Sequence, residues 1–304
     1  MKHNYPALAR VLVTGAGGII GQQTTDALLR AGIAVTALSL EFQHPSRADR
    51  VIVGDAASTD TIESALAEVD AVVHLAARPS PTAGTPYEVF RDNVSSTFNV
   101  LSQAGAHGIR RAVIASSINA FGIPMNPVDL MPAYWPLDEE SPANIGDPYS
   151  LSKHTDEATA RMASNAWGLD IAALRFPLVK DFATLRASRA ALEEDPSAMV
   201  REGWAYLDIR DAARAVLAGL TAHFTGAHVI SLSAEDTLLG RPTSELVGEY
   251  APSVPRREII AGHRSLIDTS RAESLLGFRP RYSIHRDEDA VEHHNDVAAN
   301  AAIS

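Results

Sequence analysis

The sequence predicts an α/β protein, with a doubly wound parallel sheet covered by helices on both faces and a small C-terminal subdomain. The first observation is that short apolar runs alternate with amphipathic segments from Arg10 to Arg175, an order typical of parallel sheets. The second is a glycine-rich segment, Gly15 to Gly21, between the first apolar run and the first amphipathic segment. The third is size, because 304 residues with 46% hydrophobic side chains suffice for a large buried core.

Local patterns predict each element in turn. Gly32 suits the end of the first helix, and Pro148 suits the first position of a later one. In chain order, strands are expected at 10–14, 34–40, 50–53, 71–75, 111–115 and 171–175. Helices are expected at 18–31, 60–69, 87–106 and 148–167, with one or two short helices within 180–202.

The glycine-rich segment predicts a phosphate site. Gly15, Gly18 and Gly21 are three residues apart, after a strand and at the start of a helix. Glycines so placed allow a tight turn, close approach of the backbone to a pyrophosphate, and close packing of helix on strand. The helix N-terminus adds unpaired N–H groups and a partial positive charge. The alternative is a tight turn without a ligand, but the surrounding α/β pattern favours a dinucleotide site.

The end of the second strand bears on which dinucleotide would bind. An acidic side chain is expected there to hold the ribose hydroxyls, but Ser39 takes that position and Glu41 follows two residues later. Arg47 and Arg50 are near enough in sequence to leave NADP open, and NAD is favoured. Asp55, after the third strand, is a candidate acceptor for the adenine amino group, with a simple turn cap as the alternative.

Tyr149 and Lys153 carry the predicted chemistry. They are four residues apart in a predicted helix, so their side chains share a face. A lysine cation beside a phenol favours the phenolate, which lets tyrosine exchange a proton with a substrate oxygen near neutral pH. This spacing is common by chance, and its weight comes from the glycine-rich segment and from Ser116 and Ser117 at the end of a predicted strand. A phenol, an ammonium and a hydroxyl suffice where a cofactor carries a hydride.

Composition excludes several functions. The net charge of −11 and the pI of about 5.4 disfavour nucleic acid and anionic membranes as partners. The absence of cysteine excludes disulfides, thiolate catalysis and cysteine-bound metals, and no metal site is expected. The N-terminus lacks the apolar core of a signal peptide, and no segment approaches the roughly 20 apolar residues that span a bilayer. We therefore expect a cytoplasmic protein with a small-molecule substrate.

Taken together, these motifs resemble the extended short-chain dehydrogenase/reductase superfamily, in its NAD-dependent epimerase/dehydratase branch. The resemblance extends along nearly the whole chain. It rests on the segments Thr14–Gly21, Gly54-Asp55, Val73–Ala77, Asn93–Leu101, Ser116–Gly122, Pro148–Lys153, Leu174–Pro177, Tyr206–Ala215 and Asp268–Pro280.

The resemblance implies a Rossmann-type fold, NAD as cofactor, and roles for particular residues. Tyr149 would be the general acid/base, Lys153 would hold the nicotinamide ribose, and Ser117 would bind the reacting oxygen. The other cofactor-binding residues would be Gly15, Gly17, Gly18, Ile19, Ile20, Gly21, Ser39, Glu41, Asp55, Ala56, Leu75, Ala76, Ala77, Asn93, Ala115, Phe176 and Pro177. For Asn93 a structural, loop-bridging role is favoured, and His74 is expected to be a packed core residue rather than a base.

Two departures from the family bear on the reaction and the substrate. Dehydratases of this family have acidic residues after the serine, whereas Ile118 and Asn119 follow here, which argues against dehydration. Members that act on nucleotide sugars carry a large substrate domain, whereas only about 30 residues separate Arg175 from Asp208. We therefore expect a smaller substrate, as in the uronate-dehydrogenase-like members that the chain also resembles.

The substrate contacts are the least specific part of the prediction. Isolated arginines and lysines can bind the carboxylate of a substrate, but each one alone is more typical of a solvated surface. The candidates are Arg78, Ser116, Asn119, Tyr134 and Lys180, with Trp135, Arg186 and Arg201 as further possibilities.

The sequence thus predicts an NAD(P)-dependent oxidoreductase for a small sugar-like or sugar-acid alcohol or carbonyl. The alternative is an epimerase of a sugar or nucleotide sugar, which oxidises and re-reduces one carbon. A non-catalytic dinucleotide sensor is disfavoured, because a sensor has no need of the intact Tyr149, Lys153 and Ser117 set.

The organisation of the chain follows from the same resemblance. Residues 1–176 would bind the cofactor and carry the catalytic residues, and residues 177–304 would form a small substrate-binding region interleaved with them. By analogy, a homodimer is expected through the helices at 87–106 and 148–167. The alanine-rich tail after Val291 is expected to fray or to pack as a short helix.

Overall fold

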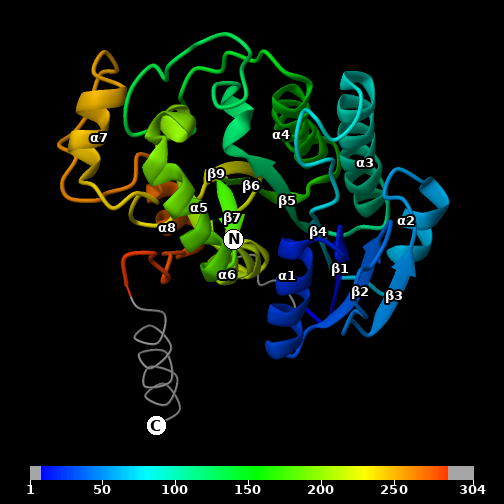
Figure 1. Ribbon diagram of the computed structural model, residues 1–304. Helices are drawn as coiled ribbons and strands as arrows, with labels where there is room; N and C mark the ends of the chain where they lie inside the picture. The colour runs from blue at the N-terminus through cyan, green and yellow to red at the C-terminus, as the bar shows by residue number, and fades with distance from the viewer. Residues whose placement is uncertain (1–7, 287–304) are drawn as a thin grey trace.

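Within residues 8–286, which the computed structural model describes, seven parallel strands form the main sheet in the order β3-β2-β1-β4-β5-β6-β9 (Figure 1). A second sheet pairs β7 with β8 in parallel. The strands are β1 (Arg10–Thr14), β2 (Ala34–Ser39), β3 (Arg50–Val53), β4 (Ala71–His74), β5 (Arg111–Ser117), β6 (Asp170–Phe176), β7 (Leu178–Lys180), β8 (Tyr206–Asp208) and β9 (Ala227–Ser231).

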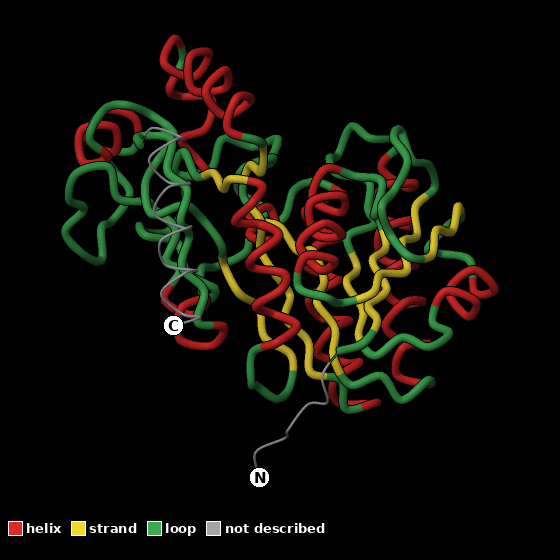
Figure 2. Tube along the Cα trace, turned by 90° about the horizontal axis from the view of Figure 1, so that it is seen from below, coloured by secondary structure: helices red, strands yellow, loops and turns green. Residues whose placement is uncertain are grey.

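Helices cover both faces of the main sheet, as Figure 2 shows from below. The α-helices are α1 (Ile19–Arg30), α2 (Thr59–Ala65), α3 (Pro86–Ala106), α4 (Pro148–Trp167), α5 (Phe182–Glu194), α6 (Ile209–Thr221), α7 (Thr243–Tyr250) and α8 (Ser270–Leu276). Two 3₁₀ segments, η1 (Ile118–Phe121) and η2 (Pro196–Glu202), complete the described elements.

Alternating side chains of β1 face two different hydrophobic cores. Val11 and Val13 pack in the core that includes Leu28 of α1 and residues of α6 and α8. Leu12, between them, packs in the core that includes Leu101 of α3 and residues of α2 and α4. This two-sided burial explains why the strands are continuous apolar runs, and it confirms the α/β fold predicted from the alternation of segments.

The strand order reverses between β1 and β4, which lie side by side in the sheet although α1, β2, β3 and α2 separate them in sequence. Connections from these two strands leave in opposite directions, so a crevice opens at their carboxyl ends. Ligands of open α/β sheets bind at such a point. Gly15, directly after β1, lies against Leu75 and Ala76, directly after β4.

The elements after residue 176 are divided between the main sheet and a separate unit at one end of it. α6, β9 and α8 belong to the main sheet and its cores, whereas α5 and α7 pack on a third core at one end of the sheet, at the left of Figure 1. Trp135 and Trp204 are the largest fully buried side chains of that third core. Trp135 comes from the long loop between η1 and α4, so this loop is a structural part of the added unit.

The observed boundaries differ from the predicted ones at two places that matter for the site. β5 continues to Ser117 rather than ending at residue 115, so Ser116 and Ser117 are strand residues. β2 ends at Ser39, and Glu41 lies in the segment that follows. β7, β8 and β9 were not expected, and β7 and β8 are only three residues long. The predicted behaviour of the tail after Val291 lies outside the described residues.

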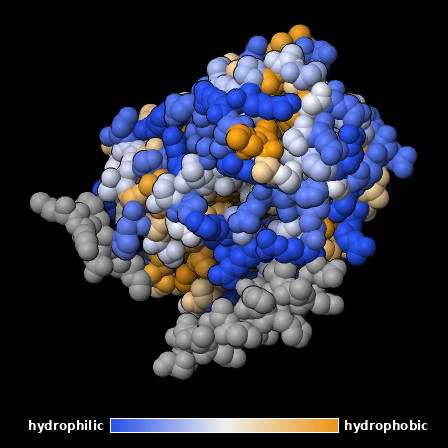
Figure 3. Space-filling view, turned by 90° about the vertical axis from the view of Figure 1, so that its left-hand side faces the viewer, coloured by the Kyte–Doolittle hydropathy of each residue, from blue (hydrophilic) through white to orange (hydrophobic). Residues whose placement is uncertain are grey.

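The last two features of the fold concern membrane-spanning character and the hydropathy of the surface. None of its helices over residues 8–286 combines the length and apolar character that crossing a membrane requires. On the face shown in Figure 3, hydrophilic residues predominate and hydrophobic ones gather in small patches.

Candidate active site

The turn between β1 and α1 is built for close approach of a ligand to the backbone. Gly15 has a φ of +67°, and a Cβ there would lie 2.6 Å from the backbone nitrogen of Ala76. A Cβ on Gly21 would lie 2.2 Å from the carbonyl oxygen of Gly15, so helix and turn are in contact there. Gly18 caps α1 without a side chain, and no acidic residue lies in the first turn. The first N–H groups of α1 therefore fit an anion such as a pyrophosphate.

The segment after β2 borders this turn on its other side. A Cβ on Gly17 would lie 2.2 Å from the carbonyl oxygen of Glu41 and 2.8 Å from Oγ of Ser39. The two arginines that left NADP open have other partners: Arg47 lies 3.6 Å from Asp26, and Arg50 donates to Ser64 at 3.1 Å. The geometry at β2 therefore favours NAD, whose ribose needs an acceptor rather than a cation.

Three other predicted cofactor residues have clear structural partners. Asp55 is exposed and accepts the N–H of Ala57 at 2.8 Å, which is a turn cap, so its contact with adenine stays a prediction. Ala56 is buried, and its carbonyl oxygen accepts from Asn99. Asn93 is 1% exposed; it bridges both backbone groups of Arg78 and donates to Ser152 at 2.9 Å. Asn93 thus fixes the segment after β4 to α4.

A cavity of about 430 Å³ lies beyond the carboxyl ends of the central strands. It brings Tyr149, Lys153 and Ser117 together, although they come from two different elements. Seven of the predicted cofactor residues line the same cavity: Ile19, Ile20, Leu75, Ala77, Ala115, Phe176 and Pro177. The volume is near the lower end of the range of about 300–1,000 Å³ that is usual for small-molecule sites.

α4 places Tyr149 and Lys153 at the cavity. Asp147 caps the helix by accepting the N–H of Ser150 at 2.8 Å, and Tyr149 follows in the first turn, 8% exposed. The ammonium of Lys153 donates to the carbonyl oxygen of Ala115 at 2.9 Å and to Asp156 at 3.2 Å. Two of its three donors are therefore in use, which leaves the third to a ligand in the cavity.

Ser117 is oriented by its neighbour Asn119. Its Oγ accepts both the backbone N–H and the side-chain amide of Asn119, each at 3.1 Å. Because the lone pairs of Oγ are occupied, its own O–H is the group that remains for the cavity. Ser117 is thus set up to donate a hydrogen bond to an oxygen bound there.

Ser116 has a different environment from its neighbour. Its Oγ donates to Glu157 at 2.6 Å, and Glu157 accepts two hydrogen bonds from Arg175, at 2.7 and 2.9 Å. All three side chains are buried, and the guanidinium of Arg175 lies over the ring of Phe121. This network joins β5, β6, α4 and η1 directly under the cavity, so Ser116 lines the cavity but has its hydrogen bond committed elsewhere.

His74 is a packed core residue, as expected. Nδ1 lies 2.8 Å from Oγ1 of Thr14, and Nε2 lies 3.2 Å from Oγ1 of Thr97. Burial, together with the nearby charge of Lys153, lowers the pKa of His74 to about 3. His74 is therefore neutral at physiological pH.

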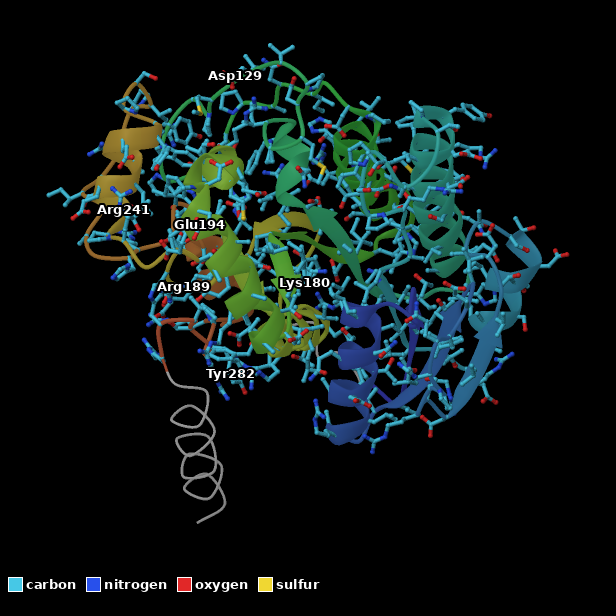
Figure 4. All side chains as sticks on the ribbon, in the orientation of Figure 1. Asp129, Lys180, Arg189, Glu194, Arg241 and Tyr282 are labelled. Atoms are coloured by element: carbon cyan, nitrogen blue, oxygen red, sulfur yellow. The ribbon has the colours of Figure 1, made fainter. Side chains whose placement is uncertain are left out.

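Several predicted substrate contacts do not reach the cavity, because other groups hold them. Arg78 donates to Asp92 and to the carbonyl oxygen of Ala83. Tyr134 donates to Asp138 at 2.6 Å and lies under Arg257, while Trp135 is fully buried in the third core. Arg201 donates to Asn126 and Asp129, and Arg186 is exposed on α5. Of the charged candidates, Lys180 does line the cavity, and Figure 4 shows it between α5 and α1.

Sequence reasoning missed two acidic residues at this site. Asp156, 1% exposed, lies one turn after Lys153, and its helical spacing could have revealed it. Burial raises the pKa of its carboxyl, and the Lys153 ammonium opposes that rise. Glu202, the last residue of η2, also lines the cavity. No local sequence pattern predicted a role for Glu202, because its position depends on the pairing of β7 with β8, which are separated by α5 and η2.

The reversal point of the sheet, the uncapped glycine turn and the Tyr149, Lys153 and Ser117 set define a dinucleotide-binding α/β enzyme. The chain belongs to the NAD dependent epimerase/dehydratase family, whose model matches residues 11–232. The family's cofactor is NAD, and the glycine turn, the segment after β2 and the cavity wall fit it. Residues 8–286 contain no group of three or more metal-binding side chains that could hold a metal ion.

Known relatives include both epimerases and dehydrogenases. A UDP-glucose 4-epimerase of Corynebacterium glutamicum is 26% identical and covers 90% of this chain and 92% of that protein. An L-arabinose 1-dehydrogenase (NAD(P)(+)) of Haloferax volcanii is 32% identical over a shorter region, 55% of this chain and 66% of that protein. The match to nearly the whole epimerase means that the length of this chain does not exclude a nucleotide sugar.

Solved structures share the fold. A short-chain dehydrogenase/reductase superfamily protein of Agrobacterium tumefaciens with bound NAD has a TM-score of 0.68 at 22% identity, over 97% of this chain and 100% of that one. A mutated uronate dehydrogenase has a TM-score of 0.66 at 20% identity, over 94% of this chain and 86% of that one.

Proposed function

We propose that this protein is an NAD-dependent oxidoreductase that transfers a hydride between nicotinamide and a small sugar-like or sugar-acid alcohol or carbonyl. The observation that carries the proposal is the convergence of Tyr149, Lys153 and Ser117 on one cavity that residues of the glycine turn and of β6 also line. A proton-transfer group, a cation and a hydroxyl donor at the same place are what this chemistry requires of the protein.

Each side chain has a distinct task in the proposed reaction. When bound, NAD supplies the hydride acceptor or donor. In alcohol oxidation, Tyr149 as phenolate takes the hydroxyl proton, and it returns that proton when a carbonyl is reduced. Ser117 donates a hydrogen bond to the reacting oxygen, since its lone pairs are held by Asn119. Lys153 holds its ammonium beside the cavity through Ala115 and Asp156 and stabilises the phenolate.

The alternative is an epimerase, which uses the same residues to oxidise and re-reduce one carbon. It is supported by the relationship to UDP-glucose 4-epimerase over 92% of that protein's length. The two proposals differ in net reaction: the oxidoreductase changes the redox state of free NAD, whereas the epimerase interconverts stereoisomers and leaves it unchanged.

The deciding experiment is a substrate screen on the purified protein. Denaturation first identifies any nucleotide that is released, and sugars, uronic acids and UDP-sugars are then tested with NAD and NADP while NADH absorbance and stereoisomer formation are recorded. Net NAD reduction by a small sugar or sugar acid is the expected result. Stereoisomer exchange without net reduction would replace the proposal with the epimerase.

Tyr149→Phe is the control that ties activity to this site. It removes the proton-transfer group but keeps the ring, so we expect kcat to fall about 10²- to 10⁴-fold with little change in NAD affinity. Activity that survives in this variant would place the chemistry elsewhere.

A further inference from the structure

The wall of the cavity formed by β7 and η2 carries one positive and one negative side chain. Lys180 is the last residue of β7, four residues after Phe176, and Glu202 is the last residue of η2. Both line the same cavity as Tyr149 and Ser117. Apolar side chains of η1, β7, η2 and the loop after η1, such as Met125 and Met199, surround them. This wall is built by the two segments that precede and follow α5, so it is separate from the elements that hold the cofactor.

Neither charge has a partner in the protein. Across residues 8–286, the side chains of Lys180 and Glu202 make no hydrogen bond and no ion pair, with each other or with any other group. Neighbouring charges behave differently: Asp208, which faces Lys180 across the β7–β8 ladder, is bound by Arg210, and Arg201 is bound by Asp129. Charged groups beside apolar walls are costly unless they are paired, so a substrate is the natural partner of these two.

We propose that Lys180 and Glu202 form a substrate subsite for a polyhydroxylated carboxylate, in which Lys180 binds the carboxylate and Glu202 binds a hydroxyl. The inference rests on the proposed function and makes it narrower, because it assigns the substrate to the sugar acids. The oxidisable carbon would lie at Tyr149 and Ser117, and the acid group would lie toward β7. An ammonium of Lys180 paired with a carboxylate is a charge-assisted hydrogen bond.

The charge balance of the cavity favours an anion. Its ionisable lining residues are Tyr149, Lys153, Lys180 and Glu202, and Asp156 already compensates Lys153 from behind at 3.2 Å. Burial raises the pKa of Glu202 to about 7, so near neutral pH a large fraction of this carboxyl is uncharged and the negative charge opposite Lys180 is reduced. An uncharged carboxyl both donates and accepts, which suits a hydroxyl better than an ammonium group.

The test measures ligand binding to the NAD-loaded protein by calorimetry. The probes are D-glucuronate, D-galacturonate and D-gluconate, with D-glucose and D-galactose as neutral counterparts, L-threonine as a hydroxylated zwitterion and UDP-glucose as a nucleotide sugar. We expect at least one sugar acid to bind about tenfold or more tightly than its neutral counterpart. Lys180→Met should lower the affinity for the acid about 10- to 100-fold and leave the neutral sugar unchanged, whereas Glu202→Gln should weaken both.

Two matched variants control for the change of charge. Arg186→Met and Glu194→Gln remove the same charges from α5, where both side chains are exposed outside the cavity; Figure 4 labels Glu194 there. Neither variant should change binding.

Several outcomes would overturn the inference: no sugar acid binds, neutral and acidic sugars bind equally, L-threonine or UDP-glucose binds more tightly, or Lys180→Met does not change the preference for the acid. The proposed function fails separately, if a sugar acid binds through Lys180 but no hydride is transferred.

Discussion

At the scale of single residues, the clearest feature is the buried ion pair of Lys153 and Asp156. Their side chains are 4% and 1% exposed, and 3.2 Å separates Nζ from Oδ2. A charge left alone in such a place is much costlier than a pair. Asp156 therefore stabilises the position of Lys153, and with it the wall of the cavity.

The first prediction tests this pair with a double-mutant cycle. Asp156→Ala leaves an uncompensated buried ammonium and should lower the free energy of unfolding by roughly 3–5 kcal/mol. Lys153→Met in the Asp156→Ala background removes that charge, so the double variant should lose less than the sum of the single ones. Urea denaturation of the four proteins measures the coupling, and strict additivity would contradict the ion pair.

The second prediction concerns pH and Glu202. Burial raises the pKa of this carboxyl from 4.5 to about 7, so the folded state holds a proton that the unfolded state has lost. The contribution of the protonated Glu202 carboxyl to the free energy of unfolding is fully present below about pH 4.5. It is lost as the pH rises to about 7. Relative to the wild type, Glu202→Gln should gain on the order of 1–3 kcal/mol between pH 4.5 and 8.

Urea denaturation of both proteins across this pH range checks the second prediction. The subtraction removes the contributions of Lys153, Lys180 and Tyr149, the other ionisable groups of the cavity. A difference that stays constant with pH would show that Glu202 is solvated in the folded protein.

At the scale of elements, α4 links helix formation to chemistry. Asp147 caps the helix at its N-terminus, Pro148 begins it, and Tyr149 lies in its first turn. The same helix supplies Lys153 to the cavity and Glu157 to the network beneath it. The sequence predicted this element to the residue, because a proline at its start and Gly168 after its end are strong boundary signals.

The third prediction tests the cap of α4. Asp147→Ala removes the acceptor for the N–H of Ser150 and should cost about 0.5–2 kcal/mol of stability. It should also lower kcat several-fold, because Tyr149 lies in the turn that the cap fixes. Ser58→Ala removes the cap of α2, a helix that does not line the cavity, and should cost similar stability without lowering kcat. Equal kcat values for the two variants would mean that the cap does not position Tyr149.

The shortest strands could not be predicted from sequence patterns. β7 and β8 are three residues each, too short for alternation to appear, and they pair across α5 and η2. Val179 of β7 and Leu207 of β8 pack in the core of the main sheet, and Tyr206 of β8 packs in the third core, to which Trp135 contributes from far upstream in the chain. Lys180 and Glu202 owe their positions to this pairing, which is why the sequence offered Lys180 as one charge among several and passed over Glu202.

At the scale of the whole molecule, α3 and α4 present apolar side chains to solvent. Tyr87 is 70% exposed, Phe98 51% and Leu151 43%. The two helices pack side by side on one face of the sheet (Figure 1). The homodimer expected from the family resemblance would cover this face, and it stays a prediction.

The fourth prediction is therefore a dimer that depends on this face. Light scattering of the wild type should give twice the monomer mass, and Phe98→Arg with Leu151→Arg should give the monomer, because charges would replace the buried apolar contacts. Ile259→Arg, at an apolar residue elsewhere that is even more exposed, should leave the dimer intact. A monomeric wild type would contradict the prediction.

The sequence alone determined the parallel sheet, the glycine turn and the Tyr149 to Lys153 helix, because each depends on neighbours within a few turns of the chain. Tertiary structure alone decided which charges reach the cavity. Arg78 and Arg201 form ion pairs with Asp92 and Asp129. The side chains of Lys180 and Glu202 form none within the described residues. A charge that the fold leaves unpaired is available to a substrate, and pairing between distant segments is a property of the folded molecule rather than of any local pattern.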